Sequence, residues 1–392
     1  MKEIQTIIGN TKAGIALVGL MLIGLVSSCS SGDSDGADEL QGAAGAPIAG
    51  VSSYMTNPED NMLQTRAWTL PTEPSDPYLT YVAYGKDTTI AIAFTQNNAE
   101  PMMGSFFYSS EKWRTDIVIP SPATYYLYGY IPSSPAIKFG VTDLSEGKTS
   151  YSTGAIMTLN NVPSVVPNDL CVVIGAKEGA DAEHDNGLRR GNFAYSAKAI
   201  SASPKKDDGN YVFLLFDHLY AALRVYIRVQ GDYAALRTIK LKSLWLNTLT
   251  DEGTTKEKTN ITVKLTSNDG TTDPITEISY APYGAVLDDG IKFWEDSKGK
   301  TLTTAYQEFT GHFMPSDVTT LVLTSVYDVY DRKGTLIREN CKATNTMVLR
   351  EMLTEQYRTL RGSRYTINMT VNPTYLYVLS DPDLDSPTVT VD

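Results

Sequence analysis

The sequence predicts an all-β protein with two domains, and three observations support this fold class. Short runs of aromatic and β-branched residues recur from Tyr78 to the C-terminus, separated by Gly, Pro, Asn and Asp. Stretches with helical periodicity are scarce, and only residues 349–360 suggest a helix. The chain has 392 residues, 42% of them hydrophobic, which is enough for two packed cores.

The first 28 residues have the features of a secretory signal peptide. Lys2 and Lys12 precede an apolar run over residues 13–26, which is too short to span a membrane as a helix. The run ends in Leu-Val-Ser-Ser-Cys, which resembles the lipobox of bacterial lipoproteins. By this resemblance the signal is removed before Cys29 and the Cys29 sulfur is acylated. An ordinary signal peptide that contains a cysteine is the alternative.

Residues 29–66 are predicted to be a leader rather than a domain. Its first part is small and acidic, cannot fold alone, and is similar to the surface-export tags of Bacteroidales lipoproteins. Arg66 is the only Lys or Arg between Lys12 and Lys86, so the Arg66–Ala67 bond is a candidate site for an Arg-specific protease. A merely solubilising Arg66 is the alternative.

The leader is also expected to have a structural role before cleavage. An open sandwich edge pairs promiscuously, so a secreted precursor needs that edge covered. Either the segment around Ile48 and Val51 or the residues just before Arg66 could lie at that edge as a placeholder strand.

Residues 67–208 and 209–373 are predicted to be the two β-rich domains, joined by a polar linker before Tyr211. In the first, residues 124–131 predict a strand that ends at Pro132. In the second, apolar residues alternate with others over residues 223–229, which predicts a strand with one buried face. Residues 321–330 and 336–341 predict a hairpin.

Residues 374–392 are predicted to be an extended tail that donates strands. Tyr365 to Val371 alternate as in a half-buried strand, and Pro373 ends that strand. Two strand-forming runs follow, on either side of an acidic spacer that contains prolines. The predicted donor residues are Tyr375, Leu376, Tyr377, Val378, Leu379, Val389 and Val391. A tail folded back on its own domain is the alternative.

No motif in the sequence indicates catalysis or metal binding. His184, His218 and His312 lie in separate segments without His-x-x-x-His or Cys-x-x-Cys spacing. His218 is expected to be packed and hydrogen-bonded, and Cys171 and Cys341 to be buried, inert thiols. We therefore predict no enzyme, no metal and no cofactor. The net charge of −12 argues against a nucleic acid as partner.

The order of these features resembles the fimbrillin family, the subunits of type V pili made by Bacteroidales. Besides the lipobox and the leader, the segments that carry the resemblance are residues 125–132, 216–223, 327–334 and 375–383. The family implies two transthyretin-like, Greek-key β-sandwich domains and delivery to the outer membrane as a lipoprotein. It also implies removal of the leader by an Arg-specific protease and polymerisation by donation of a terminal strand to the neighbouring subunit.

The predicted function is therefore that of a structural pilin, a stalk subunit of adhesive surface pili that binds copies of itself or related pilins. Its location would be the outer membrane before cleavage and the extracellular pilus afterwards; the sequence does not identify a host or bacterial surface ligand. A tip or anchor subunit is one alternative. Another is a surface glycan-binding lipoprotein that stacks sugars on Trp68, Trp113, Trp245 or Trp294.

Overall fold

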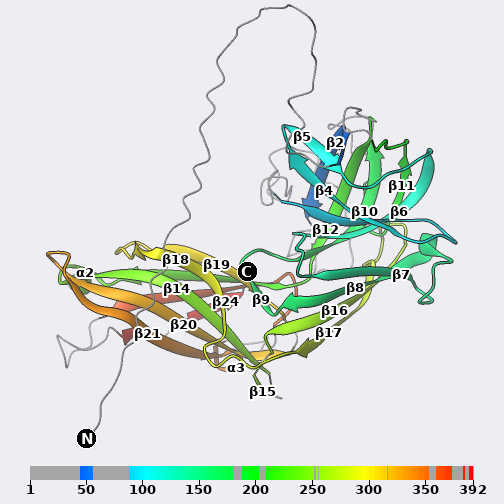
Figure 1. Cartoon of the computed structure of the whole chain (residues 1–392). Helices are drawn as coiled ribbons and strands as arrows, with labels where there is room; N and C mark the ends of the chain where they lie inside the picture. Colours follow the sequence, from blue (N-terminus) through cyan, green and yellow to red (C-terminus); the bar gives the residue numbers. More distant parts are fainter. Residues whose placement is uncertain are drawn as a thin grey trace, which may run out of the picture. The chain divides into compact units, whose positions relative to one another are not determined.

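The computed structural model describes residues 45–55, 88–179, 188–202, 209–250, 253–254, 256–315, 317–352, 359–372, 383–384 and 388–391. These residues form four β-sheets, which confirms the predicted all-β class (Figure 1). The helices among them are short: η2 (Tyr151–Thr153), α2 (Gly231–Ala234) and α3 (Leu349–Met352). The helix predicted over residues 349–360 thus begins as expected but has ended by residue 359. Within the described ranges, no helix is long and apolar enough to cross a membrane.

The largest sheet has nine strands, in the order β1-β5-β4-β3-β6-β10-β12-β2, with β11 paired to β6. Its strands are β1 (Ala46–Ile48), β2 (Gly50–Met55), β3 (Ile90–Thr95), β4 (Met102–Ser109), β5 (Lys112–Thr115), β6 (Ala123–Ile131), β10 (Cys171–Gly179), β11 (Ala194–Ala197) and β12 (Tyr211–His218). The strand predicted to end at Pro132 is β6, which confirms that prediction.

This nine-stranded sheet closes on itself through the leader. β1 pairs with β5 at one end of the strand order, and β2 pairs with β12 at the other end. Because Ala49 alone separates β1 from β2, only about 7 Å of chain joins the two pairings. The closed sheet surrounds an apolar core to which nearly every strand contributes, including Ile48, Ile92, Phe106 and Val173.

The other face of the nine-stranded sheet packs against a four-stranded sheet with the order β17-β16-β8-β7. That sheet consists of β7 (Lys138–Asp143), β8 (Gly154–Pro163), β16 (Lys258–Thr266) and β17 (Ile275–Tyr283). Residues from both sheets, among them Tyr128, Ile174, Met157 and Val263, form a second core. Strands such as β3 are therefore buried on both faces, which explains their continuous apolar sequence.

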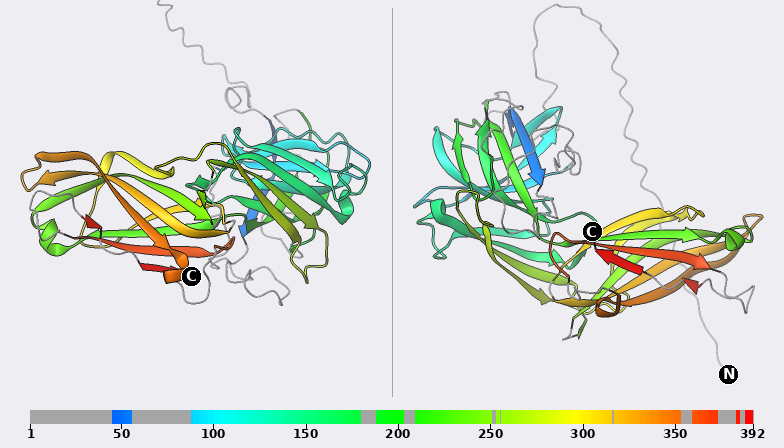
Figure 2. Two further views of the ribbon diagram at one scale, coloured as in Figure 1. Left: turned by 90° about the horizontal axis from the view of Figure 1, so that it is seen from below. Right: turned by 180° about the vertical axis from the view of Figure 1, so that it is seen from behind.

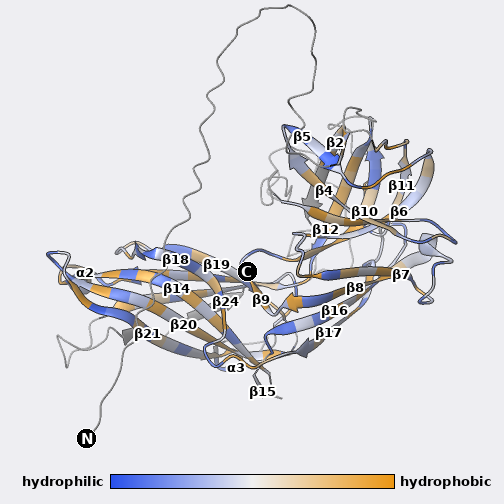
Figure 3. Ribbon diagram, viewed as in Figure 1, coloured by the Kyte–Doolittle hydropathy of each residue, from blue (hydrophilic) through white to orange (hydrophobic). Residues whose placement is uncertain are grey.

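The remaining two sheets pack face to face around a third core. A six-stranded sheet contains β9 (Val165–Val166), β13 (Ala221–Val229), β19 (Gln307–Phe313), β22 (Arg364–Asn372), β23 (Asp383–Leu384) and β24 (Thr388–Val391). A five-stranded sheet contains β14 (Arg237–Thr250), β15 (Gly253–Thr254), β18 (Ile291–Thr301), β20 (Val318–Asp331) and β21 (Leu336–Val348). Figure 3 shows the alternating hydrophobic and hydrophilic bands along these strands. β13 confirms the predicted alternation, and β20–β21 the predicted hairpin.

Sheet membership does not follow the predicted division between residues 208 and 209. Strand β12 lies after that point but pairs with β10 in the nine-stranded sheet. The hairpin β16–β17 also lies after it but pairs with β8, whereas β9 lies before it and pairs with β19. Each packed body is therefore built from chain segments on both sides of the predicted boundary.

Candidate functional site

The leader strand β1 covers the edge of β5. Ala46, Pro47 and Ile48 lie opposite Thr115, Arg114 and Trp113 in an antiparallel ladder. The Arg114 Nη1 donates a hydrogen bond to the Gly45 carbonyl at 3.3 Å, which fixes the start of the strand. Ile48 is only 2% exposed, so its side chain belongs to the enclosed core.

The leader strand β2 covers the edge of β12. It runs parallel to β12, with Gly50 opposite Tyr211 and Met55 opposite Phe216. The Gly50 N–H donates to the Asn210 carbonyl at 3.2 Å, and Val51 is only 3% exposed. Figure 2 shows from behind that this strand, in blue, lies in the same layer as the green strands.

The leader segment thus pairs with two strands in succession, with β5 through residues 46–48 and with β12 through residues 50–55. The expected position around Ile48 and Val51 is confirmed, since both side chains are buried in strands at sheet edges. Other predicted leader residues, namely the lipidation site Cys29 and the cleavage site Arg66–Ala67, lie outside the described residues. Their roles stay predictions.

The end of the tail pairs within its own chain. Val389 and Val391 lie in β24, which runs antiparallel to β22 opposite Ile367 and Tyr365 (Figure 2). β23 pairs with β22 as well, through Leu384 and Val371 among its residues. In the single chain these two short strands are therefore folded back on their own domain, as in the alternative prediction for the tail. The other predicted donor residues, Tyr375, Leu376, Tyr377, Val378 and Leu379, lie outside the described residues.

The tryptophans that the structure describes are covered by other side chains. Trp113 is 9% exposed. Trp245 is half-buried, with the Lys292 ammonium 5.5 Å from its ring centroid. Trp294 is also half-buried and packs edge-on against Phe309 at 4.7 Å between ring centroids. Trp113 is thus buried, and Trp245 and Trp294 are each partly occupied by a neighbouring side chain; Trp68 lies outside the described residues.

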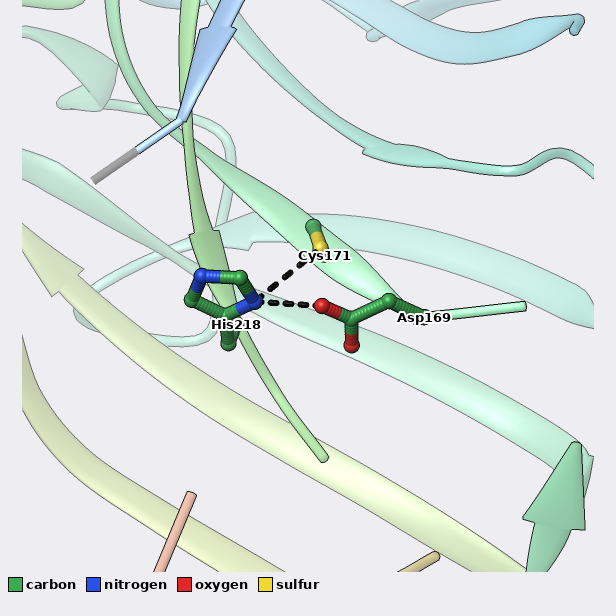
Figure 4. A group of neighbouring side chains, drawn as sticks. All are labelled: Asp169, Cys171 and His218. Carbon is green, nitrogen blue, oxygen red and sulfur yellow. Dashed lines mark hydrogen bonds and ion pairs between the residues drawn. The ribbon is translucent and has the colours of Figure 1, made fainter. Parts of the chain in front are cut away.

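A second group of side chains gathers where β10 begins and β12 ends (Figure 4). Asp169 and Cys171 are two residues apart, and the β10–β12 register places Cys171 opposite His218. The His218 Nδ1 closely contacts the Asp169 Oδ2 and lies 4.0 Å from the Cys171 Sγ. The expected burial is confirmed for Cys171 but not for Cys341, which is half-buried, and the expected hydrogen bonding of His218 is provided by Asp169.

This group cannot act as a Cys–His–Asp relay. Such a relay places the thiol at one imidazole nitrogen and the carboxylate at the other, whereas here both face Nδ1. Burial raises the pKa of Asp169, but the neighbouring His218 outweighs that effect and the net pKa is lowered. Asp169 is therefore an anion at neutral pH.

His312 lines the same cavity of about 240 Å³ as Asp169 and His218. Its Nδ1 lies 3.2 Å from the Pro167 carbonyl oxygen. Because a carbonyl only accepts hydrogen bonds, Nδ1 carries the proton and Nε2 has the lone pair. Burial lowers the pKa of His312, so the ring is neutral at pH 7. His184 lies outside the described residues.

Little in the sequence indicates this cluster. Cys171 and His218 are 47 residues apart, and they meet only because β10 and β12 pair in this register. The i, i+2 spacing of Asp169 and Cys171 at the start of an apolar strand was the one local sign, since such residues lie on the same face. Spacing rules for metal motifs assume ligands that are close in sequence.

No family model matches the sequence, and no curated protein matches it. Among solved structures, the chain is similar to a protein from Bacteroides uniformis assigned to cell adhesion, with 11% identity, a TM-score of 0.36 and coverage of 79% of this chain and 94% of that one. A fimbrial protein from Bacteroides vulgatus is 11% identical, with a TM-score of 0.32 and coverage of 87% and 98%. The fimbrial anchor protein Mfa2 from Porphyromonas gingivalis is 9% identical, with a TM-score of 0.25 and coverage of 86% and 96%.

Proposed function

We propose that this chain is a structural pilin, exported as a lipoprotein, matured by cleavage after Arg66 and polymerised by strand exchange into surface pili. The observation that carries the proposal is the position of the leader. Residues 46–55 supply the strands that pair with β5 and with β12, yet they lie on the N-terminal side of Arg66. One cut after Arg66 separates those strands covalently from the sheet that they complete.

Loss of the leader would uncover two strand edges, that of β5 where residues 46–48 pair and that of β12 where residues 50–55 pair. β5 and β12 would each expose unpaired N–H and C=O groups, which favours addition of another strand. The side chains of Ile48 and Val51 would leave apolar space in the enclosed core, which an incoming strand can refill. Each main-chain hydrogen bond contributes about 0.5–1.5 kcal/mol whichever residue provides it. The register of the new strand would therefore depend on its apolar side chains.

The tail of a neighbouring copy is the proposed occupant. Residues 374–392 number nineteen and can extend about 60 Å, long enough to run along a neighbouring subunit. Tyr375, Tyr377 and Leu379 would face one way from such a strand, with Leu376 and Val378 on its other face. Within the single chain, β24 makes only four residue pairs with β22, so its release disrupts little structure.

Lipid attachment at Cys29 and an Arg-specific protease complete the proposal. The lipid would hold the precursor at the outer membrane, and cleavage at Arg66–Ala67 would remove lipid and leader together. The buried or covered state of Trp113, Trp245 and Trp294 weakens the alternative of a glycan-binding lipoprotein. A stalk position is favoured over the tip, because a tip subunit has no neighbour beyond it to receive a donated strand.

Mass analysis of filaments sheared from cells tests the maturation step. Subunits of the unaltered protein should begin at Ala67. Arg66→Ala should leave a folded, full-length lipoprotein that does not polymerise, whereas the control Lys86→Ala, at the next basic residue along the chain, should assemble normally. Filaments whose subunits begin at acylated Cys29 would overturn the proposal.

Deletion of residues 374–392 tests the donor. If the tail is donated, the truncated subunit keeps its melting temperature, enters a filament and cannot be followed by another subunit. Unfolding or aggregation of the truncated protein would instead identify the tail as a strand of its own domain.

A further inference from the structure

We propose that Asp169, Cys171 and His218 form a binding site for a divalent transition metal ion, and that the ion is zinc. A carboxylate oxygen, a thiol sulfur and an imidazole nitrogen all lie within 4.8 Å of one another. Figure 4 shows the three side chains pointing toward one spot between the start of β10 and the end of β12.

The geometry fits a tetrahedral ion after a small adjustment. The Cys171 Sγ and His218 Nδ1 are 4.0 Å apart, close to the separation of about 3.5 Å that donors have around one zinc ion. The Asp169 Oδ2 lies closer to Nδ1 than that and has to rotate outward slightly. Asp169 lies two residues before β10, outside the β10–β12 pairing, so its side chain can rotate without breaking a strand pairing.

The donor set favours zinc over harder cations. Thiolate, imidazole and carboxylate are the usual ligands of Zn²⁺, whereas Ca²⁺ and Mg²⁺ prefer oxygen alone. Carboxylate and thiolate together carry two negative charges, which balance the ion. The site is also well enclosed: Cys171 is 0% exposed, and the side chains of His218 and Asp169 are 15% and 14% exposed.

His312 can complete the coordination from across the cavity. The Pro167 carbonyl holds its Nδ1–H, so the lone pair is on Nε2, which is the arrangement typical of zinc-bound histidines. His312 is outside the group of three but lines the cavity with Asp169 and His218, so it can contact the ion through a bound water molecule.

Nearby cations are largely balanced by other carboxylates. Arg224 pairs with Glu308 at 2.9 Å, and Arg361 pairs with Asp217 at 2.8 Å. Arg364 also lines the cavity and lowers the affinity for a cation, an effect that the two anionic donors offset. A bound ion would tie β10 to β12 and, through His312, to β19.

A shared proton is the competing explanation, because His218 can donate an ordinary hydrogen bond to Asp169 without any metal. The test uses the full chain in a Cys29→Ala background, so that its thiols are Cys171 and Cys341. After treatment with a chelator, the protein is titrated with Zn²⁺ and then, separately, with Co²⁺. We expect about one ion per chain, a higher melting temperature with Zn²⁺, and a cobalt spectrum with tetrahedral d–d bands and a thiolate charge-transfer band.

Two matched variants locate the ion. Cys171→Ser should weaken zinc binding at least about tenfold and abolish the charge-transfer band, whereas Cys341→Ser should change neither. His312→Ala should weaken binding and keep the charge-transfer band. The cobalt spectrum is recorded on the parent protein, so it tests the proposal even if a variant fails to fold. Absence of a thiolate band, or equal zinc binding by the Cys171→Ser and Cys341→Ser variants, would overturn the proposal in favour of a shared proton or an adventitious ion only.

Discussion

Arg361 and Asp217 form a buried ion pair, with the Arg361 Nη1 at 2.8 Å from the Asp217 Oδ2. Asp217 is fully buried at the end of β12, and Arg361 precedes β22. The same nitrogen also donates to the His218 carbonyl at 3.2 Å, and Nη2 donates to Asp273 at 3.0 Å. One guanidinium therefore joins the end of β12, the start of β17 and the segment before β22.

Removing one partner of this pair should be costly. Arg361→Ala leaves the Asp217 carboxylate buried without its cation, so we expect a loss of about 3–5 kcal/mol in the free energy of unfolding. Urea denaturation followed by circular dichroism measures it. The control is Lys148→Ala, which removes the exposed pair with Glu100 and should cost about 0–1 kcal/mol. Equal losses for both variants would contradict this interpretation of Arg361.

Gly129 should tolerate no side chain. A Cβ at this position in β6 would lie 2.3 Å from the Ala91 carbonyl oxygen in the adjacent strand β3. We expect Gly129→Ala to destabilise the protein by about 1–3 kcal/mol or more, because backbone on β3 has to move. At Gly231, the first residue of α2, a Cβ meets nothing within 4 Å, so Gly231→Ala should instead stabilise by about 0.4–1 kcal/mol. Thermal unfolding compares the two variants.

Asp143 should make stability depend on pH in acid. Its carboxylate accepts hydrogen bonds from Gly147, Thr149 and Ser150, among other groups of the following loop. The Gly147 N–H and then these other donors hold the pKa of Asp143 well below its ordinary value of 3.8. Since the pKa is lower in the folded state, the stabilisation is complete above about pH 4 and is lost as the pH falls toward the folded pKa.

Melting temperatures between pH 2 and pH 7 test this dependence. The unaltered protein should melt above the Asp143→Asn variant at pH 7, and the gap should narrow below about pH 4. Asp289→Asn, at an exposed carboxylate, serves as the control. A gap that widens in acid would contradict the assignment.

Ile48 should stabilise the full-length chain. Replacing this 2% exposed side chain by alanine leaves a cavity in the enclosed core, at a cost of about 2–5 kcal/mol. Hydrogen exchange of the full chain should show protected amides in residues 46–55 that exchange faster in Ile48→Ala. Val286→Ala, at a 43% exposed position, should leave their exchange unchanged. Rapid exchange throughout residues 46–55 of the unaltered chain would rule out the leader strand.

The local sequence pattern predicted most individual strands, because the pattern within a strand shows which of its faces are buried. Tyr365, Ile367, Met369 and Val371 are buried on one face of β22, as their alternation predicts. The hairpin β20–β21 turns at Asp331, whose N–H bonds to the Thr335 carbonyl. Such features depend on neighbours in the chain, which a sequence contains directly.

Pairings between distant segments could not be predicted in the same way. The partner of β16 is β8, about a hundred residues earlier, and the choice depends on how whole sheets pack. The cluster of Asp169, Cys171 and His218 depends likewise on the β10–β12 register. The sequence suggested that the leader covers a sheet edge. It did not indicate that one segment joins both ends of a sheet.

The parallel pairing of β13 with β22 has a mechanical consequence in the proposed filament. Eight residue pairs join the strands, from Ala222–Arg364 to Val229–Val371. Traction from the nine-stranded sheet reaches β13 at its N-terminal end through β12, whereas traction from the tail reaches β22 at its C-terminal end. In a parallel pair these points lie at opposite ends of the ladder, so tension loads all its hydrogen bonds together in shear instead of peeling them apart one by one. Rupture is a question of unfolding rate rather than equilibrium stability, and this geometry slows it.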